Sequence, residues 1–385
     1  METGLPPSSA IPPRKILVRG TNWLGDAVMT TPALLRLREK FPSAHIALLT
    51  PEKLQELWSD HSAIDEVISA TPDEGVLAVA QRLRAQKYDL ALVLPNSPRS
   101  ALETWLARIP QRIGYARPWR NFFLTKPLAP RADTVLMQKR SVSEIRQLVA
   151  ADANRRVTSD ERAFTNAAAN AHQMHEYLHL AAALGANAEP LLPRLFVTPN
   201  EVENARRKFG LAKITGPIFG LNPGAEYGPA KRWPMEKFIA AAGEIQVRTG
   251  CTWLVFGGPA DAPIGKRIES AIPSPPSAIW NLAGKTSLRE LMALLKLCRV
   301  LLTNDTGPMH VAAALGTPVI ALFGSTSPEL TGPGLPGDPR HRLLKSDALC
   351  APCFLRECPI DFRCLNGISA ERVVKAVMEM AGTTK

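Results

Sequence analysis

Short apolar runs alternate with amphipathic runs along most of the chain. The first apolar run, Lys15–Arg19, enters a glycine-containing turn, and apolar residues then recur at helical spacing from Asp26 to Lys40. Strands that alternate with helices in this way indicate an α/β fold with a mostly parallel sheet covered on both faces. The other elements predicted in this half are strands at 45–49, 66–69 and 88–94 and helices at 75–86 and 174–184.

The same alternation restarts in the second half of the chain. Strands are predicted at 218–221, 253–256, 300–303 and 318–323, and a final helix at 370–380. Most of these strands end in glycine or polar residues, and ligands bind at the carboxyl ends of strands in such sheets. Residues 185–199 are rich in proline and glycine and suit a connection between two domains.

Four segments are predicted from this pattern. Residues 1–13 form a disordered Pro- and Ser-rich extension, 14–187 an N-terminal domain, 188–368 a C-terminal domain, and 369–385 a last helical segment. The strand signals fail between about 132 and 171, which predicts an excursion from the first domain.

Composition narrows the class of protein. A hydrophobic content of 45% and a mean hydropathy of −0.05 exclude a wholly disordered chain and a multi-spanning membrane protein. The opening residues lack the basic start and apolar core of a signal peptide, so we expect a cytoplasmic protein. The net charge of +11 favours anionic partners, although an ordinary basic surface is the alternative.

Much of the positive charge is concentrated in one segment. Between Arg99 and Arg140 there are nine basic residues and two acids, with tryptophan, tyrosine and phenylalanine interleaved. This composition suits a phosphate-bearing lipid, a membrane surface or nucleic acid. Because no nucleic-acid-binding motif accompanies it, nucleic acid is not predicted as a partner.

The turn after the first strand lacks the fingerprint of a dinucleotide-binding site. Gly20 and Gly25 are separated by four residues, no third glycine follows, and the second strand does not end in an acid. We therefore predict no cofactor. Asp26 begins the following helix, where it either caps the helix or, beside Asn22 and Trp23, accepts a proton from a substrate hydroxyl.

Two turns in the second half suit a phosphate. The turn at Asn304–His310 leads into a helix of small residues, whose amide groups favour an anion such as a diphosphate; a Gly-Pro turn capped by Thr306 is the alternative. Lys231 follows the glycine turn at 222–228 and is suited to neutralising a departing phosphate, unless it is an ordinary surface lysine.

Four cysteines, Cys350, Cys353, Cys358 and Cys364, lie close together in the sequence. Four thiols are enough to ligate a metal, but this spacing is not that of a zinc ribbon, and a reduced or locally cross-linked loop is favoured. The chain also lacks a D-x-D acidic pair. No metal site is predicted.

Four separated segments together resemble one family. They are NWLGDAVMTTPAL at 22–34, LPNSPRSAL at 94–102, NPGAEYGPAKRWP at 222–234 and TNDTGPMHVAAALGTP at 303–318. They are similar to the type II members of the ADP-heptose-dependent lipopolysaccharide heptosyltransferases, glycosyltransferase family 9. The resemblance implies a GT-B type fold, with two Rossmann-like domains that face each other across a cleft.

The resemblance also implies a reaction and its participants. The donor would be ADP-heptose, the acceptor the heptosyl inner core of lipopolysaccharide, and the place the cytoplasmic face of the inner membrane, to which the enzyme would bind peripherally. Transfer would be inverting and independent of a metal ion. A heptosyltransferase of type I or III is the alternative within the family, and a non-enzymatic lipid-binding protein or an epimerase-like protein is the alternative outside it.

The resemblance implies roles for individual residues. Asp26 and Lys231 are the predicted catalytic residues. The predicted donor site comprises Gly224, Ala225, Glu226, Lys231, Gly257, Asn304, Asp305, Thr306, Gly307, Met309 and His310. The predicted acceptor site comprises Asn22, Trp23, Asn96, Ser97, Arg99, Ser100, Arg117 and Arg120.

Overall fold

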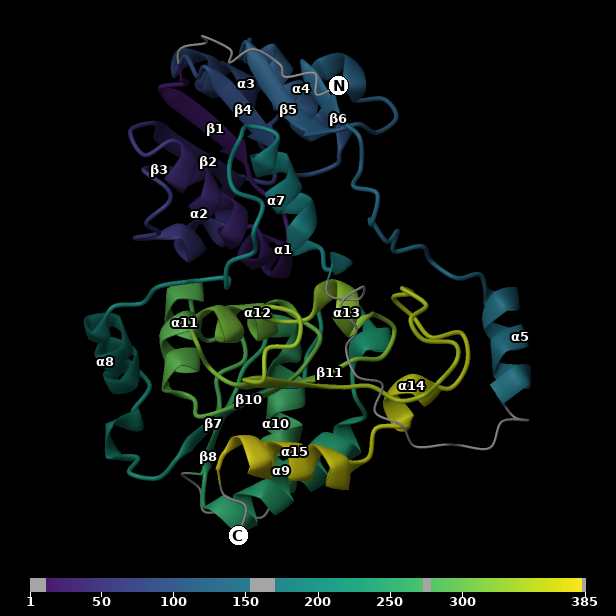
Figure 1. The fold of residues 1–385 in the computed structure, drawn as a ribbon. Helices are drawn as coiled ribbons and strands as arrows, with labels where there is room; N and C mark the ends of the chain where they lie inside the picture. The colour runs from purple at the N-terminus through teal and green to yellow at the C-terminus, as the bar shows by residue number, and fades with distance from the viewer. Residues whose placement is uncertain (1–11, 153–169, 273–277, 383–385) are drawn as a thin grey trace. The chain divides into compact units, whose positions relative to one another are not determined.

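A computed structural model describes residues 12–152, 170–272 and 278–382 (Figure 1). The chain forms two compact units. The first unit contains the described residues up to Asn22, Ala33–Arg131 and Tyr177–Glu189; the second contains Trp23–Pro32 and the described residues of 132–176 and 190–385. The units therefore differ from the predicted contiguous domains, because 23–32 and the described residues of 132–176 pack with the second unit.

Each unit is built on a parallel sheet of six strands. The first sheet has the order β3-β2-β1-β4-β5-β6 and the second the order β12-β11-β10-β7-β8-β9. The first sheet consists of β1 (Lys15–Arg19), β2 (His45–Pro51), β3 (Glu66–Ala70), β4 (Leu90–Val93), β5 (Gln111–Tyr115) and β6 (Lys126–Leu128). The second consists of β7 (Ile218–Asn222), β8 (Thr252–Val255), β9 (Ile279–Asn281), β10 (Leu301–Asn304), β11 (Val319–Leu322) and β12 (His341–Leu344).

Helices cover these sheets. The first unit holds most of α2 (Thr31–Lys40) and α7 (Met174–Ala182), together with α3 (Val76–Ala85), α4 (Pro98–Leu106) and the short 3-10 helices η1 (Glu52–Trp58) and η2 (Asn121–Phe123). The second unit holds α1 (Leu24–Met29), α5 (Val142–Asp152), α8 (Pro199–Lys208), α9 (Met235–Thr249), α10 (Ala262–Ala271), α11 (Leu288–Leu297), α12 (Gly307–Ala314), α13 (Pro328–Thr331), α14 (Arg363–Asn366) and α15 (Ala370–Met380), with the 3-10 helices η3 (Leu211–Lys213), η4 (Pro229–Lys231) and η5 (Pro259–Asp261).

The central strands are buried on both faces, and their apolar runs predicted them. In β1, Ile16, Leu17 and Val18 are completely buried, and Leu17 lies opposite Ala47 of β2 and Ala91 of β4. The α/β, GT-B type fold predicted from this pattern is confirmed. The final helix α15 has the predicted bounds, and its Val373, Val374 and Val377 belong to the core of the second unit.

The predicted helix from Asp26 to Lys40 is two helices. The chain breaks at Thr30, where the hydroxyl groups of Thr30 and Thr31 donate to the carbonyl oxygens of Ala27 (2.6 Å) and Val28 (2.8 Å). The first helix, α1, is capped by Trp23, so Asp26 lies in its first turn and is not its cap residue.

The excursion predicted at 132–171 is described only in part. Within it, α5 packs through Ile145 against Cys350 and Cys353 of the second unit. Residues 153–169 of this prediction, and 1–11 of the predicted extension, lie outside the described residues.

Candidate functional site

The site of the second unit forms where its strand order reverses, between β7 and β10. Asn222, at the end of β7, donates from Nδ2 to the hydroxyl groups of Thr303 (3.1 Å) and Thr306 (2.9 Å). Asn304, at the end of β10, donates from Nδ2 to the carbonyl oxygen of Pro223 (2.7 Å). These amide groups join the turns that follow β7 and β10. The joined turns, 222–224 and 303–306, are called the floor of the site, and we expect them to form a rigid surface beneath a ligand.

Glycines let the chain approach closely around this floor. A Cβ atom at Gly224 would clash with the carboxylate of Asp261, so a larger residue would displace that side chain. Gly228 has a φ of 149°, and a Cβ atom there would lie 2.5 Å from the carbonyl oxygen of Arg356. The same carbonyl accepts a hydrogen bond from the amide of Ala230 (3.0 Å) and so holds η4 in place.

Lys231, on η4, is placed against the end of β10. Its Nζ lies 2.6 Å from Oδ2 of Asp305, and only 14% and 4% of the two side chains are exposed. The hydroxyl of Thr326, after β11, donates to the same oxygen of Asp305 (2.5 Å). Asp305 thus fixes the position of the ammonium group, which lies at the carboxyl ends of the strands, where an anionic ligand would bind.

Two cations, Lys231 and Arg356, lie beside the aromatic ring of Tyr227. Nζ of Lys231 lies 4.9 Å from the centre of the Tyr227 ring, and the guanidinium carbon of Arg356 lies 5.2 Å from it. Within the described part of the chain, the Arg356 side chain makes no ion pair. Arg356 and Lys231 together therefore offer two positive charges for one carboxylate.

Helix α12 begins at this floor. Its N-cap residue Thr306 makes no hydrogen bond from its side chain to the helix, and its hydroxyl oxygen accepts from Asn222. The hydroxyl proton can then be donated to a ligand. The positive end of the helix dipole favours a negative charge at the same place.

Asp26 belongs to the same compact unit as these residues. Helix α1 packs directly on α12, because a Cβ atom at Gly25 would lie 2.8 Å from Cδ2 of His310 and one at Gly307 would lie 2.9 Å from Cβ of Leu24. Oδ1 of Asp26 accepts a hydrogen bond from Nε2 of Gln173 (2.7 Å). The carboxylate is therefore fixed in position.

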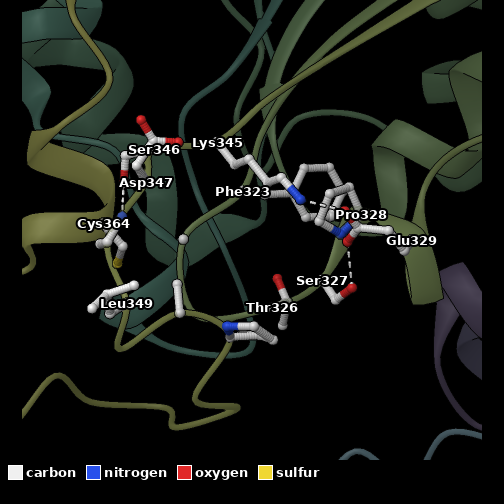
Figure 2. A pocket seen from close by; sticks show the side chains of 14 residues that line it. Phe323, Thr326, Ser327, Pro328, Glu329, Lys345, Ser346, Asp347, Leu349 and Cys364 are labelled. Carbon is white, nitrogen blue, oxygen red and sulfur yellow. Dashed lines mark hydrogen bonds and ion pairs between the residues drawn. The ribbon is translucent and has the colours of Figure 1, made fainter. Parts of the chain in front are cut away.

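A polar pocket of about 280 Å³ lies beyond Asp305, at the carboxyl ends of β11 and β12 (Figure 2). Thr326 forms part of its wall, so the pocket adjoins the Lys231–Asp305 pair. Glu329 accepts hydrogen bonds from Lys345 and from the hydroxyl of Ser327 (2.6 Å), while Asp347 lines the pocket from the loop after β12. Carboxylates and hydroxyl groups of this kind suit a ligand rich in hydroxyl groups.

The predicted acceptor residues lie mainly at the switch point of the first sheet, after β1 and β4. Glu103, which is buried, accepts from Nε of Arg99 and of Arg19, both at 2.9 Å, and Arg19 reaches Oδ1 of Asn22 (3.2 Å). Ser97 caps α4 by accepting from the amide of Ser100. Charge pairs and a helix cap thus organise this surface. Of the remaining predicted residues, Asn96 is exposed and Arg117 lies 5.8 Å from the Tyr115 ring centre.

Several of the predicted ligand residues are buried. Arg120 and Ser100 are 0% exposed; Arg120 donates from Nη1 to the carbonyl oxygen of Pro95 (2.8 Å) and to Asn96 Oδ1 (3.3 Å). Burial lowers the pKa of Arg120 to about 10. Arg120 and Ser100 both help to hold the loop after β4, and their contact with an acceptor stays a prediction. Ala225 and Met309, predicted in the donor site, are also buried and pack beneath it.

The remaining predicted donor residues lie at the strand ends. Gly257 approaches Asp261, since a Cβ atom there would lie 2.7 Å from the Cβ of Asp261. Glu226 is exposed beside the glycine turn. The sequence reasoning missed Gln173, Thr326, Tyr227 and Arg356. Thr326 follows the strand predicted at 318–323, and it could have been predicted because ligands bind at the carboxyl ends of such strands. Nothing in the local sequence marks Gln173.

The cysteines are all reduced. Backbone amides of Cys353 and Phe354 donate to the carbonyl oxygen of Ser325 (3.1 and 2.7 Å), which anchors the cysteine segment to the loop after β11. Burial raises the pKa of Cys364 to about 12, so its thiol stays protonated at neutral pH. Across 12–152, 170–272 and 278–382, no three histidine, cysteine or acidic side chains come close enough to hold a metal ion.

We expect acid to destabilise the second unit. Burial lowers the pKa values of His172, His310 and His341 to about 4. As the pH falls from 6.5 towards 4, the unfolded chain binds protons that the folded chain does not, so the free energy of unfolding falls. Each histidine contributes about 2 kcal/mol of this loss at pH 5.

Urea unfolding followed by tryptophan fluorescence at pH 7 and pH 5 measures this effect. His172→Asn should reduce the difference between the two unfolding free energies by about 2 kcal/mol. Equal unfolding free energies at pH 7 and pH 5 in the unaltered protein would contradict the expectation.

The sequence of this chain is similar to the sequences of one enzyme family. The family model described as glycosyltransferase family 9 (heptosyltransferase) matches residues 76–362. Lipopolysaccharide heptosyltransferase 2 of Salmonella typhimurium is 33% identical over 329 residues, which cover 83% of this chain and 85% of the relative.

Solved structures are similar over nearly the whole chain. The ADP-heptose lipopolysaccharide heptosyltransferase II of E. coli has a TM-score of 0.74 and 28% identity, covering 95% of this chain and 98% of that one. A family 9 glycosyltransferase of Veillonella parvula shares the fold, with a TM-score of 0.75 and 24% identity over 96% and 98% of the two chains. The protein is therefore an enzyme of glycosyltransferase family 9, the heptosyltransferases.

Proposed function

We propose that the protein transfers L-glycero-D-manno-heptose from ADP-heptose to the heptosyl-Kdo-lipid A inner core of lipopolysaccharide. The observation that carries this proposal is the placement of Asp26, fixed by Gln173, on a helix packed against α12, in the same unit as Lys231 and Asp305. Relatives named heptosyltransferase 2 at 31 to 33% identity support this choice of donor and acceptor over a type I or III acceptor.

In this reaction Asp26 acts as the general base. Its carboxylate takes the proton of an acceptor hydroxyl, whose oxygen bonds to the anomeric carbon of the donor heptose. The bond from that carbon to the phosphate oxygen breaks on the opposite face, and ADP leaves with the electron pair. The product therefore has the inverted anomeric configuration.

The departing ADP needs stabilisation of its new negative charge. We assign this task to the ammonium group of Lys231, the guanidinium of Arg356, and the hydroxyl of Thr306 with the start of α12. Because these fixed donors supply the positive charge, we propose that transfer does not require a divalent cation. The polar pocket beside Thr326 would receive sugar hydroxyl groups.

The acceptor carries a lipid, so the enzyme must work at a membrane surface. No helix in the described ranges has both the length and the apolar character needed to cross a bilayer. We therefore propose peripheral association with the cytoplasmic surface of the inner membrane, with the acceptor bound by the first unit.

Turnover of ADP-heptose tests the proposal. ADP release by the purified protein in EDTA should depend on a heptosyl-Kdo-lipid A acceptor. Release with Kdo-lipid A that lacks heptose would instead support a type I acceptor, and release only after Mg²⁺ is added would contradict the metal-independent mechanism. Tight ADP binding without release on any acceptor would mean that the proposed sugar or acceptor is wrong.

A further inference from the structure

The first unit contains a pocket that lies away from the strand-end sites. It has a volume of about 620 Å³ and lies over α3, α4 and the start of β5. Figure 1 shows α3 and α4 together in the blue part of the ribbon. The residues lining the pocket are Leu77, Ala80, Gln81, Arg84, Trp105, Leu106, Arg108 and Arg112. Three of them are arginines and none is acidic.

Two of these arginines are available to a ligand. Arg84 and Arg108 are exposed, and in the part of the chain that the structure describes neither guanidinium has an ion pair or a hydrogen bond. The neighbouring Arg82, by contrast, pairs with Glu74 at 2.9 Å. Arg112 donates from Nε to the carbonyl oxygen of Phe123 (2.7 Å), which fixes its position in the wall. Guanidinium groups without a carboxylate are suited to a phosphate.

The rim of the same pocket is apolar and exposed. Leu77 is 67% exposed and Trp105 38% exposed, although both line the pocket. The Trp105 ring lies 6.1 Å from that of Phe122, which is 79% exposed, and 5.6 Å from that of Phe123. Large side chains that gather around a hollow in this way mark an interaction surface rather than a scatter of exposed residues.

We propose that this pocket binds the phosphate group of an anionic phospholipid and docks the first unit on the bilayer. Arg84 and Arg108 contact the phosphate, while Leu77, Trp105 and Phe122 enter the boundary between headgroups and acyl chains. The combination of cations with a tryptophan and aliphatic residues matches that boundary, where aromatic rings concentrate. The inference rests on the proposed function, because it supplies the membrane contact that a lipid-linked acceptor requires.

A lipid fits this surface better than a nucleic acid does. Beside Trp105, Leu77 and Leu106 give the pocket aliphatic walls, and aliphatic side chains insert among acyl chains but do not stack on a base. The rings of Phe122 and Phe123 meet edge to face at 82°, so they pack on each other. Free phosphate would satisfy the arginines but would leave the apolar rim in water.

Vesicle flotation with the full-length protein tests the proposal. Vesicles of phosphatidylethanolamine and phosphatidylglycerol should bind the protein, and vesicles of phosphatidylcholine alone should bind it at least tenfold more weakly. Arg84→Ala/Arg108→Ala should weaken binding to the anionic vesicles about 25-fold at low salt, at about fivefold for each arginine. Trp105→Ser/Phe122→Ser should weaken it at least tenfold, because less apolar surface is buried.

A matched control removes the same charge elsewhere. Arg207 and Arg248 of the second unit are exposed and make only local helical pairs, so Arg207→Ala/Arg248→Ala should bind the vesicles as the unaltered protein does. Equal binding of the Arg84→Ala/Arg108→Ala protein and this control would overturn the proposal. So would equal binding to neutral vesicles, or single-stranded RNA that displaces the protein from them.

Turnover separates this inference from the proposed function. With a deacylated, water-soluble acceptor, Arg84→Ala/Arg108→Ala should release ADP at the unaltered rate, whereas with a vesicle-bound acceptor its rate should fall. A fall with both acceptors would place the arginines in the acceptor site and overturn the lipid assignment. If the unaltered protein turns over neither acceptor, the proposed function fails while the vesicle measurement still decides the docking surface.

Discussion

Asp26→Asn is expected to lower the rate of heptosyl transfer by about 10³-fold. The amide cannot accept the proton of the acceptor hydroxyl, so the attacking oxygen keeps its proton and becomes positively charged as the new bond forms. Asparagine retains an Oδ1 atom, and this atom can still accept the hydrogen bond that Gln173 makes to Asp26 in the unaltered protein. The loss should therefore reflect chemistry and not a displaced helix.

ADP release under saturating donor and acceptor measures this effect. Calorimetry with ADP should give the same dissociation constant for the variant as for the unaltered protein, because the donor residues are intact. Asp73→Asn is the matched control, since Asp73 is an exposed residue of the first unit. A variant that keeps more than a tenth of the turnover would remove Asp26 from the role of base.

Lys231→Ala should lower kcat by about 10²- to 10³-fold and weaken ADP binding. The lysine supplies a fixed positive charge where the diphosphate leaves, and solvent replaces it poorly. The variant also leaves the carboxylate of Asp305, only 4% exposed, without its partner, which lowers stability as well.

A double variant separates these two effects. In Lys231→Ala/Asp305→Asn the orphaned charge is gone, so the melting temperature should recover while kcat stays low. Lys213→Ala, at an exposed position in the second unit, should change neither quantity. Recovery of kcat together with the melting temperature would show that Lys231 acts only on stability.

The sequence predicted best those parts of the fold that are buried on two sides. Strands β1 and β10 are buried over almost their whole length, and both were predicted within a residue of their bounds. Strands β5 and β12 escaped prediction because Gln111, Arg112 and Arg342 interrupt their apolar pattern. These strands lie nearer the edges of their sheets, where polar side chains reach solvent.

The candidate site was predictable where chemistry follows a strand. Asp305 and Lys231 stand in glycine- and polar-rich turns at strand ends, and the structure pairs them. The environment of Asp26 was not predictable, because it depends on Gly25 meeting His310 and on Gln173, which are all far apart in the sequence. The burial of Arg120 was not predictable, because a basic residue in a basic segment gives no sign of being buried.

The assignment of α1 to the second unit has a consequence for biosynthesis. The six strands of the first sheet have all been synthesised once residue 128 is made, so that sheet can assemble early, as soon as these residues emerge from the ribosome. Helix α1 cannot take its place so early, because its partner α12 is synthesised much later, after strands β7 to β10 of the second sheet. The residues around Asp26 therefore stay without their packing partner until α12 has been made. A ribosome-bound chain that ends before α12 can contain a folded first sheet, but its Asp26 is not yet positioned to act as the base.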